Sequence, residues 1–480
     1  MIAANEKKLK NDVEEIIEFI NASQLEITQK YDISLKKITE IIKNEDYRNA
    51  RSKYILNDIE KNTALQKSLS CISTLCLNYH CERCPINKYC NHYINQLRVK
   101  NEKPQTSNMI DLFCGAGGLS LGFTQEGFIS KLANDIQECC VDTYAHNHPE
   151  TPSENIILGD INEVIPKIKE ITKSQSIDIV VGGPPCQGFS MANRQRLIDD
   201  PRNHLYKSYV EVVNFVKPTF FVMENVKGML SVADQVVEDF EKIGYKVNYK
   251  VLNAKDFGVP QNRERLIYIG NRIEIDNLSI FRDIDSLSNS IPNYYLKDAL
   301  YGLKTLEPLK IKNSTNHVDE KTGARIMPSL NEVNDYINLI NLDKSINVTC
   351  NHKSRYNNDR DIEIYRRLFP GDRSDDPKIA DIMPYKNRNH IFKDKYFKLE
   401  PNKVCKTITA HMKYDCNMYI HPTQPRGLTP REAARVQSYP DDYYFRGAFT
   451  QTYMQVGNSV PPLLGRAIAK IIKKYLKKEE

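Results

Sequence analysis

Apolar residues between Met109 and Gly270 come in short runs that predict a β-sheet. The runs are MIDLF, ISKLAND, NIILGD, IDIVVGG, TFFVMEN, KVNYKVLNA and RLIYIG, and stretches of mixed polarity, long enough for a helix, lie between them. Because strands that alternate with helices form βαβ units, we expect an α/β domain with a doubly wound parallel sheet, the Rossmann-like arrangement.

The flanking parts of the chain follow other patterns. Apolar residues such as Val13, Ile16 and Ile20 share one face of a predicted helix near the start. The stretch from about residue 275 to 425 is polar, irregular and rich in Asn and Lys, which predicts a second, smaller domain. We therefore predict a helical arm (1–70), a Cys-rich module with a linker (71–106), the α/β domain (107–275), the second domain (276–440) and a C-terminal segment that returns to the α/β domain (441–480).

Composition narrows the classes of protein. No run of 18 or more apolar residues occurs, and the first residues are charged where a signal peptide is apolar, so we expect a cytoplasmic protein. The net charge of +6 is compatible with a polyanionic partner but does not require one. Twelve cysteines without a secretory segment indicate thiols, metal ligands or catalysis rather than disulfides.

Three features in the first half of the α/β region suit a nucleotide-like cofactor. A glycine-rich turn, Asp111–Gly118, follows the first predicted strand, where glycines let a ligand approach the backbone. Asp135 ends the second strand and Asp160 ends the third, where carboxylates could accept hydrogen bonds from ribose hydroxyls and an adenine amino group. Each Asp alone reads as an ordinary strand end or helix cap, but the three features in register indicate a cofactor site.

Three further features suit covalent chemistry. Cys186 follows two prolines on a loop that leaves the strand IDIVV, where a thiol is poorly placed for core packing and well placed to react as a thiolate. Glu224 lies at the end of the strand TFFVMEN, at the edge where ligands of such sheets bind. The segment Gln261–Arg265 precedes the strand RLIYIG, and its arginines could equally be surface charges.

In this order the segments resemble the blocks of the DNA cytosine-5 methyltransferases. The matching segments are DLFCGAGG, GGPPCQGFS, MENV, QNRER, RGLTPREAARVQSYPDDY and QVGNSVPP, and the likeness runs from Asn108 to Lys474. It implies a methyltransferase that uses S-adenosylmethionine, with a target-recognition domain between the fourth and fifth blocks, acting on duplex DNA.

The resemblance assigns roles to the candidate residues. Cys186 would add to C6 of cytosine and make C5 nucleophilic, while Glu224 would hold or protonate N3. Arg263 and Arg265 match the arginines that orient the base and the catalytic groups. The target cytosine would be flipped out of the duplex. The cofactor-binding positions would be Phe113, Gly115, Ala116, Gly118, Asp135, Ile136, Asp160, Pro184, Asn458 and Val460, and the DNA-contacting positions Gln187, Ser190 and Arg194.

Five cysteines between residues 71 and 90 need a separate explanation. The ending Cys81-x2-Cys84-Pro-x4-Cys90 resembles the four-iron–four-sulfur loop of endonuclease III-type DNA glycosylases, although the upstream spacing differs. We expect the ligands Cys76, Cys81, Cys84 and Cys90, with Cys71 as the alternative fourth ligand. Zinc is the main alternative to the iron–sulfur cluster, and a cysteine cluster that binds no metal is the third alternative.

Competing functions are a tRNA cytosine-5 methyltransferase on the same fold and a DNA-binding regulator that acts through the N-terminal region. The long second domain favours duplex DNA, and the intact Cys186, Glu224 and Arg263 favour an enzyme. A nicotinamide dehydrogenase would explain the glycine-rich turn alone. We expect a monomer that acts in a restriction–modification or an orphan DNA-modification system, without a stable complex with any cognate restriction endonuclease. No code translates the second domain into a recognition sequence.

Overall fold

The computed structural model describes residues 107–148, 150–185, 204–314, 319–343, 346, 348–384 and 395–476. The predicted helical arm, the cysteine cluster with Cys71, Cys76, Cys81, Cys84 and Cys90, and the loop with Cys186, Gln187, Ser190 and Arg194 lie outside the described residues. Predictions on those segments therefore stay predictions.

All seven predicted strands occur, and they form one sheet in the order β3-β2-β1-β4-β5-β7-β6. Their bounds are β1 Ser107–Leu112, β2 Phe128–Asp135, β3 Ile156–Leu158, β4 Ile179–Gly182, β5 Phe220–Val226, β6 Lys246–Asn253 and β7 Glu264–Asn271. The expectation of a purely parallel sheet is wrong for β7, which runs antiparallel to both β5 and β6. The segment between β6 and β7 holds only the short 3-10 helix η6 (Ala254–Phe257), and so short a connection favours antiparallel neighbours.

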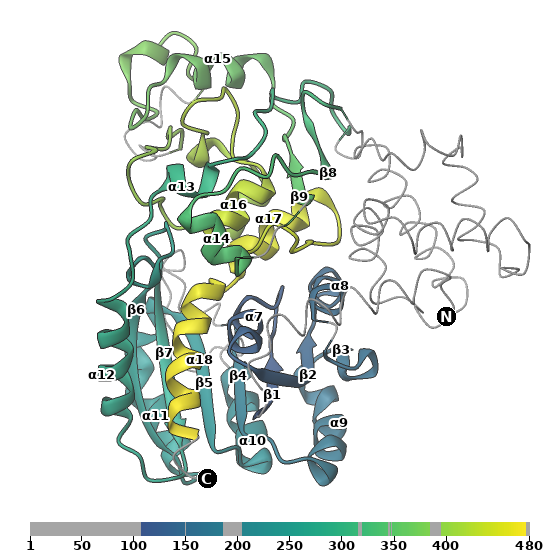
Figure 1. Ribbon diagram of the computed structural model, residues 1–480, viewed down its shortest axis with the longest axis vertical. Coiled ribbons are helices and arrows are strands. Elements are labelled where there is room, and N and C mark those ends of the chain that lie inside the picture. The colour runs from purple at the N-terminus through teal and green to yellow at the C-terminus, as the bar shows by residue number, and fades with distance from the viewer. Residues whose placement is uncertain are drawn as a thin grey trace, which may run out of the picture.

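Helices cover both faces of the sheet, as the doubly wound prediction requires (Figure 1). Alternate strand residues point to opposite faces, so Met109 and Ile110 belong to different cores. One face carries α7 (Gly118–Gln125), α12 (Asn277–Ser288) and α18 (Pro462–Leu476). The other carries α9 (Ile161–Ser174), α10 (His204–Val216) and α11 (Ala233–Glu241). Beside β2 and β3 lies α8 (Glu138–Asn147).

Helices α7 and α18 pack closely against each other where glycine residues leave space. A Cβ atom on Gly122 of α7 would meet the backbone nitrogen of Arg466 in α18, and one on Gly118 would meet the carbonyl oxygen of Val460. The two helices can therefore approach at backbone distance, which brings residues about 340 positions apart into one layer. The C-terminal segment thus returns to the sheet.

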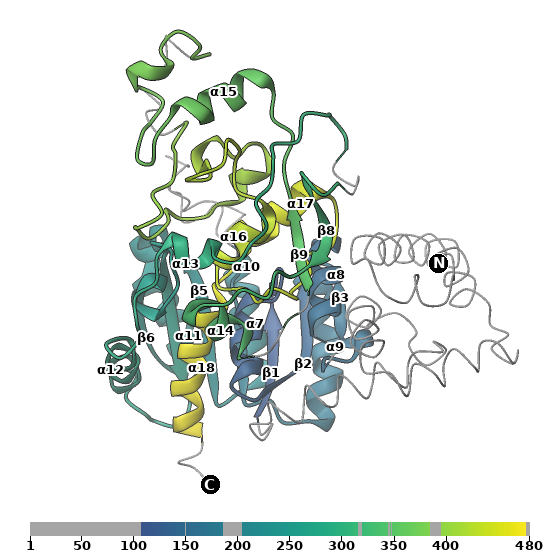
Figure 2. The ribbon, with the colours of Figure 1, turned by 45° about the horizontal axis from the view of Figure 1, so that its top comes forward.

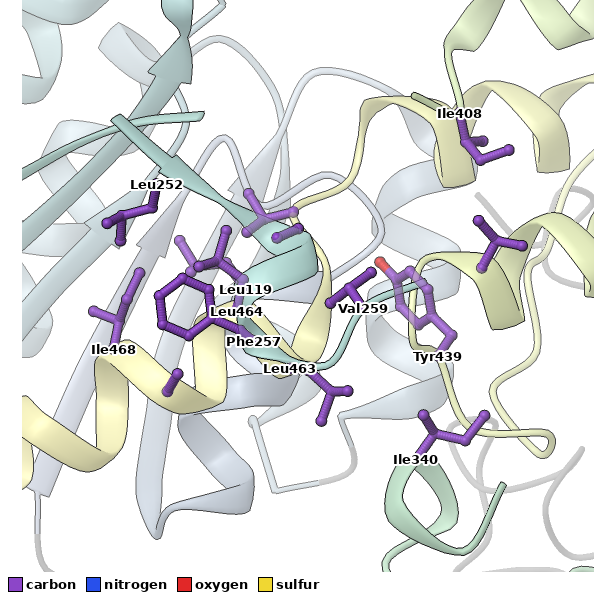
Figure 3. Packing of buried hydrophobic residues seen from close by; sticks show 14 of the residues in the cluster. Leu119, Leu252, Phe257, Val259, Ile340, Ile408, Tyr439, Leu463, Leu464 and Ile468 are labelled. Carbon is purple, nitrogen blue, oxygen red and sulfur yellow. The ribbon is translucent and has the colours of Figure 1, made fainter. Parts of the chain in front are cut away.

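A second body of short elements continues from the sheet, with α15 at its far end (Figure 2). The antiparallel strands β8 (Gly323–Pro328) and β9 (Val348–Lys353) form its small sheet. Its helices are α13 (Leu296–Leu300), α14 (Asp335–Asn341), α15 (Asp359–Arg367), α16 (Pro430–Val436) and α17 (Phe449–Asn458). Ile340 and Ile408 from this body share a buried cluster with Leu119 and Leu464 of the sheet layer (Figure 3).

Charged residues of the RGLTPREAARVQSYPDDY block are buried and support this body. Arg426 donates two hydrogen bonds to the Glu432 carboxylate, at 2.7 and 2.6 Å, and Arg435 donates two to Asp441, at 2.6 and 2.8 Å. The Arg431 guanidinium donates to backbone carbonyls instead. Such planar, bidentate pairs suit arginine, and breaking one would leave an uncompensated buried charge.

Buried histidines make the fold sensitive to mild acid. Burial lowers the pKa of His352 to about 4 and the pKa values of His146 and His421 to about 3. These residues stay neutral in the folded chain at pH values where the unfolded chain, with a histidine pKa of about 6.5, takes up protons. Their stabilising effect is therefore complete above about pH 6.5 and is lost as the pH falls toward the folded values.

We predict a fall in unfolding free energy of about 2 kcal/mol for each of these histidines between pH 7.5 and pH 5. Chemical denaturation at the two pH values measures it. His352→Gln should reduce the pH dependence, whereas His411→Gln, at a largely exposed histidine, should keep it. Equal pH dependence of the unfolding free energy in His352→Gln and the wild type would contradict the prediction.

Candidate functional site

Several predicted site residues that the structure describes lie along one edge of the sheet. Strands β1 to β5 run parallel, and their carboxyl ends lie in register, with Leu112 beside both Asn134 and Gly182, and Asp135 beside Leu158. Ligands of open α/β sheets bind outside this edge. The glycine-rich turn, both acidic strand ends and Glu224 lie along it, as the sequence predicted.

Asp135 organises the glycine-rich turn. Its carboxylate accepts hydrogen bonds from the backbone N–H of Gly115, at 2.9 Å, and of Gln137, at 2.8 Å. Burial raises the pKa of this carboxyl above its ordinary value. Phe113 and Gly115 both have positive φ angles, 55° and 53°, and within the described residues no atom beyond the chain neighbours of Gly115 lies within 4 Å of a Cβ placed on it. The turn therefore keeps open space beside an acidic group.

Asp111 lies beneath the turn and was not predicted to act. Its Oδ2 accepts a hydrogen bond from the Ser120 hydroxyl, whose oxygen in turn accepts one from Tyr144. Burial raises the pKa of Asp111 to about 8. Within the described residues its Oδ1 is buried and has no hydrogen-bond partner. The only signal in the sequence was its place at the start of the glycine-rich block.

Two predicted cofactor residues join the turn to the C-terminal segment. The carbonyl oxygen of Ala116 accepts a hydrogen bond from the Tyr443 hydroxyl, and Gly118 packs on Val460 and Tyr439. Ala116 is buried. These contacts place the turn against the C-terminal segment.

Apolar side chains flank the acidic strand ends. Ile136, directly after β2, is 67 % exposed, and Leu158, the last residue of the neighbouring β3, is 50 % exposed, although large apolar side chains gain by burial. Asp160 follows Leu158 and caps α9, because its Oδ1 accepts hydrogen bonds from Asn162. Leu158 was missed by sequence reasoning, since an apolar residue at a strand end normally packs in the core.

Glu224 and Arg265 form an ion pair at the same edge. Arg265 Nε lies 2.7 Å from Glu224 Oε1, and the two side chains are only 13 % and 12 % exposed. A Cβ atom on Gly183 would lie 2.9 Å from Glu224 Oε2, so glycine leaves room for the carboxylate. Asn225 Nδ2 donates to the carbonyl oxygen of Pro184 at 3.0 Å. The chain leading to Cys186 is thereby held two residues before the cysteine.

Arg263 behaves differently from Arg265. Its side chain is fully buried, and its guanidinium donates to the carbonyl oxygens of Ile408 (2.7 Å), Gly457 (3.0 Å) and Ser459 (2.8 Å). These contacts join the Gln261–Arg265 segment to the C-terminal block. Asn458 is exposed between two of the carbonyls. The structure thus brings Arg265, but not the guanidinium of Arg263, to Glu224.

The predicted metal ligands lie outside the described residues. Within the described part, no group of three or more His, Cys, Asp or Glu side chains could hold a metal ion. In the same part, no helix has the length and apolarity needed to cross a membrane.

Known proteins resemble this chain over most of its length. The family described as C-5 cytosine-specific DNA methylase matches residues 107–474. Type II methyltransferase M1.HphI from Haemophilus parahaemolyticus is 35% identical over 382 residues, covering 76% of this chain and 86% of that protein. Type II methyltransferase M.DdeI from Desulfomicrobium norvegicum is 34% identical over 394 residues, covering 77% and 89%. A crystal structure described as a DNA modification methyltransferase encoded within a prophage (E. coli) aligns with a TM-score of 0.56 and 27% identity, covering 78% of this chain and all of that one.

Proposed function

Because the chain belongs to the C-5 cytosine-specific DNA methylase family, we propose that it modifies a specific duplex sequence in a restriction–modification system. It is a DNA cytosine-5 methyltransferase and uses S-adenosylmethionine. The observation that carries the proposal is the Glu224–Arg265 ion pair beside the GGPPC loop, at the edge that also holds the Asp135 turn. Type II relatives support the restriction–modification setting.

The residues at the edge fit S-adenosylmethionine. Asp135 offers acceptors to ribose hydroxyls, and the exposed Ile136 and Leu158 offer apolar surface to an adenine ring. The open space at Gly115 and the unpartnered Oδ1 of Asp111 suit the methionine end, whose ammonium is a donor. When bound, the cofactor supplies an electrophilic methyl group. Phe113, Asp160, Pro184, Asn458 and Val460 complete the proposed binding set.

The protein supplies the nucleophile and the groups that stabilise the charge developing on the cytosine ring. The Cys186 thiolate adds to C6 of cytosine, and the electron pair of the C5–C6 bond becomes available at C5. The Glu224 carboxyl, as the protonated acid, donates a hydrogen bond or its proton to N3, where negative charge would otherwise build, and Arg265 orients this carboxyl group. C5 would then take the methyl group while the carbon–sulfur bonding pair stays on the cofactor sulfur. A base would remove the C5 proton, and the electron pair left at C5 would re-form the C5–C6 double bond as Cys186 leaves C6 as the thiolate. Arg263 acts as a positioning residue through its three carbonyl contacts.

The target carbon lies inside a stacked duplex, so the cytosine must leave the helix. We assign base reading to residues 276–440 and closure over the flipped base to the loop with Gln187, Ser190 and Arg194. Phosphate contacts would place the duplex and base-edge contacts would select the sequence.

Bisulfite sequencing of plasmid DNA, propagated with and without the protein, tests the proposed function. We expect one short sequence to be protected at a single cytosine only when the protein is present. Cellular tRNA from the same cultures is sequenced in parallel. Protection of tRNA without protection of DNA would favour the tRNA alternative and reject the proposal.

A separate prediction concerns the cysteine cluster between residues 71 and 90. Five cysteines within twenty residues would repel one another as thiolates or oxidise, so we expect a metal there that supports structure or DNA binding. Anaerobically purified protein with a four-iron–four-sulfur cluster should be brown and contain iron and sulfide, whereas a zinc protein should be colourless with about one zinc per chain. Serine replacement of Cys81 and Cys84 should release the metal. Absence of both metals from fresh protein would end this hypothesis.

A further inference from the structure

An exposed turn near the reactive edge carries side chains that the mechanism does not use. It consists of the 3-10 helix η9 (Ala410–Lys413) and Tyr414, and we call it turn 410–414. Tyr414 is 65 % exposed, its ring lies 5.4 Å from that of His411, and the Lys413 ammonium lies 4.8 Å from its centre. Cations, imidazoles and phenols are side-chain groups that contact nucleic-acid phosphates and bases.

The turn is joined through its backbone to the segment that supplies Arg265. Arg263 holds the carbonyl oxygen of Ile408, just before the turn, and the Thr407 hydroxyl donates to the carbonyl oxygen of Asn262 at 2.6 Å. On the other side, a Cβ atom on Gly457 would meet the backbone of residues 409 and 410. The exposed side chains therefore keep a defined place relative to the Glu224–Arg265 pair.

Arg355 holds the turn from the second body. It lies just after β9, and its guanidinium donates to the carbonyl oxygens of Met412 (2.7 Å), Lys413 (3.1 Å) and Tyr414. It also lies over the Tyr453 ring of α17, 5.8 Å from the centre. A planar guanidinium with several fixed donors can hold successive carbonyls in one geometry, whereas a lysine ammonium is a single flexible point of contact.

We propose that Arg355 is a positioning residue for DNA, which fixes turn 410–414 so that Lys413 and Tyr414 contact the backbone of the duplex beside the target cytosine. The proposal rests on the proposed function, since DNA is the ligand it assumes. Asp415 is the acidic residue next to the turn, and its carboxylate is engaged by the Asn417 N–H and lies 3.8 Å from His411 Nε2. The exposed tip therefore presents mainly donors and a cation to a polyanion.

Steady-state kinetics of Arg355→Lys and Tyr414→Ala test this on a plasmid that carries the target sequence. We expect the KM for DNA to rise about tenfold, the loss of one contact worth about 1.4 kcal/mol. The kcat at saturating DNA and the Kd for S-adenosylmethionine should stay within about twofold, since neither residue touches the reacting atoms. Arg272→Lys is the matched control, because Arg272 is exposed just after β7, outside residues 276–440, and its guanidinium also donates to a backbone carbonyl, that of Lys217 at 2.8 Å.

Fluorescence anisotropy with a labelled duplex containing the target separates the two proposals. Weaker binding by Tyr414→Ala and Arg355→Lys, with wild-type affinity for Arg272→Lys, supports the contact. A wild type that binds DNA in this way but methylates none would reject only the proposed function. Tyr414→Ala changes an exposed side chain, so it tests the contact even if Arg355→Lys unfolds. Unchanged DNA affinity and KM in Tyr414→Ala would overturn the proposal, as would an Arg355→Lys variant that loses thermal stability alone.

Discussion

Cys186→Ser is expected to reduce methyl transfer to duplex DNA by at least about 10³-fold, because a hydroxyl is a far weaker nucleophile than a thiolate and cannot replace it at C6 of cytosine. Binding of S-adenosylmethionine and DNA should persist, since neither depends on that bond. Transfer of a radioactive methyl group measures the rate, and calorimetry measures cofactor binding.

Covalent trapping provides the decisive control for the same step. On DNA with 5-fluorocytosine at the target, the wild type should remain attached through Cys186, because fluorine at C5 cannot leave as a proton does. Cys350→Ser, at a buried cysteine of β9 that lies away from the described edge residues, should still be trapped. A Cys186→Ser enzyme with nearly wild-type turnover would contradict the covalent mechanism.

Glu224→Gln is expected to lower kcat by about 10²-fold or more, the usual range for general acid–base help. Glutamine keeps the shape and one hydrogen bond, but it cannot carry the proton that Glu224 would pass to N3, and it alters the carboxyl group whose Oε1 lies 2.7 Å from Arg265 Nε. Single-turnover kinetics with saturating DNA and cofactor measure the chemical step directly.

The chain offers a close control for this carboxylate. Glu264 is adjacent to Arg265 in the sequence, but its carboxylate pairs with Lys227 at the surface, so Glu264→Gln should leave kcat unchanged. If Glu224→Gln turned over as fast as Glu264→Gln, with equal cofactor affinity, Glu224 would be a structural residue and the proposed role at N3 would fall.

Most of the sheet could be predicted because the signal for a strand is local. Each apolar run is short, five of the seven end in Gly, Asp or Asn, and each has the same pattern whichever strands it later pairs with. The direction of each strand was harder to predict from the sequence. The antiparallel β7 depends on which neighbour it meets after a short connection, and that is a property of the assembled sheet.

The site divides in the same way. Asp135, Glu224 and Cys186 could be proposed from the sequence, because reactive side chains next to strand ends or glycine-rich loops stand out against a local background. The different placement of the Arg263 and Arg265 side chains could not be predicted from the sequence. They are two positions apart, yet one is fully buried against carbonyls from residues 408 to 459, and the other reaches Glu224.

The sequence by itself determined that this protein has an α/β fold, where its strands lie and which edge carries the chemistry, because alternation, strand ends and motif order are properties of neighbouring residues. Only the tertiary structure decided which polar residues serve the site and which support the fold. Arg355, Arg426 and Arg435 look like surface charges in the sequence, but each has partners brought close by folding. A buried ionic or polar group is stabilised only when those partners are in place, so its role is set by the whole fold.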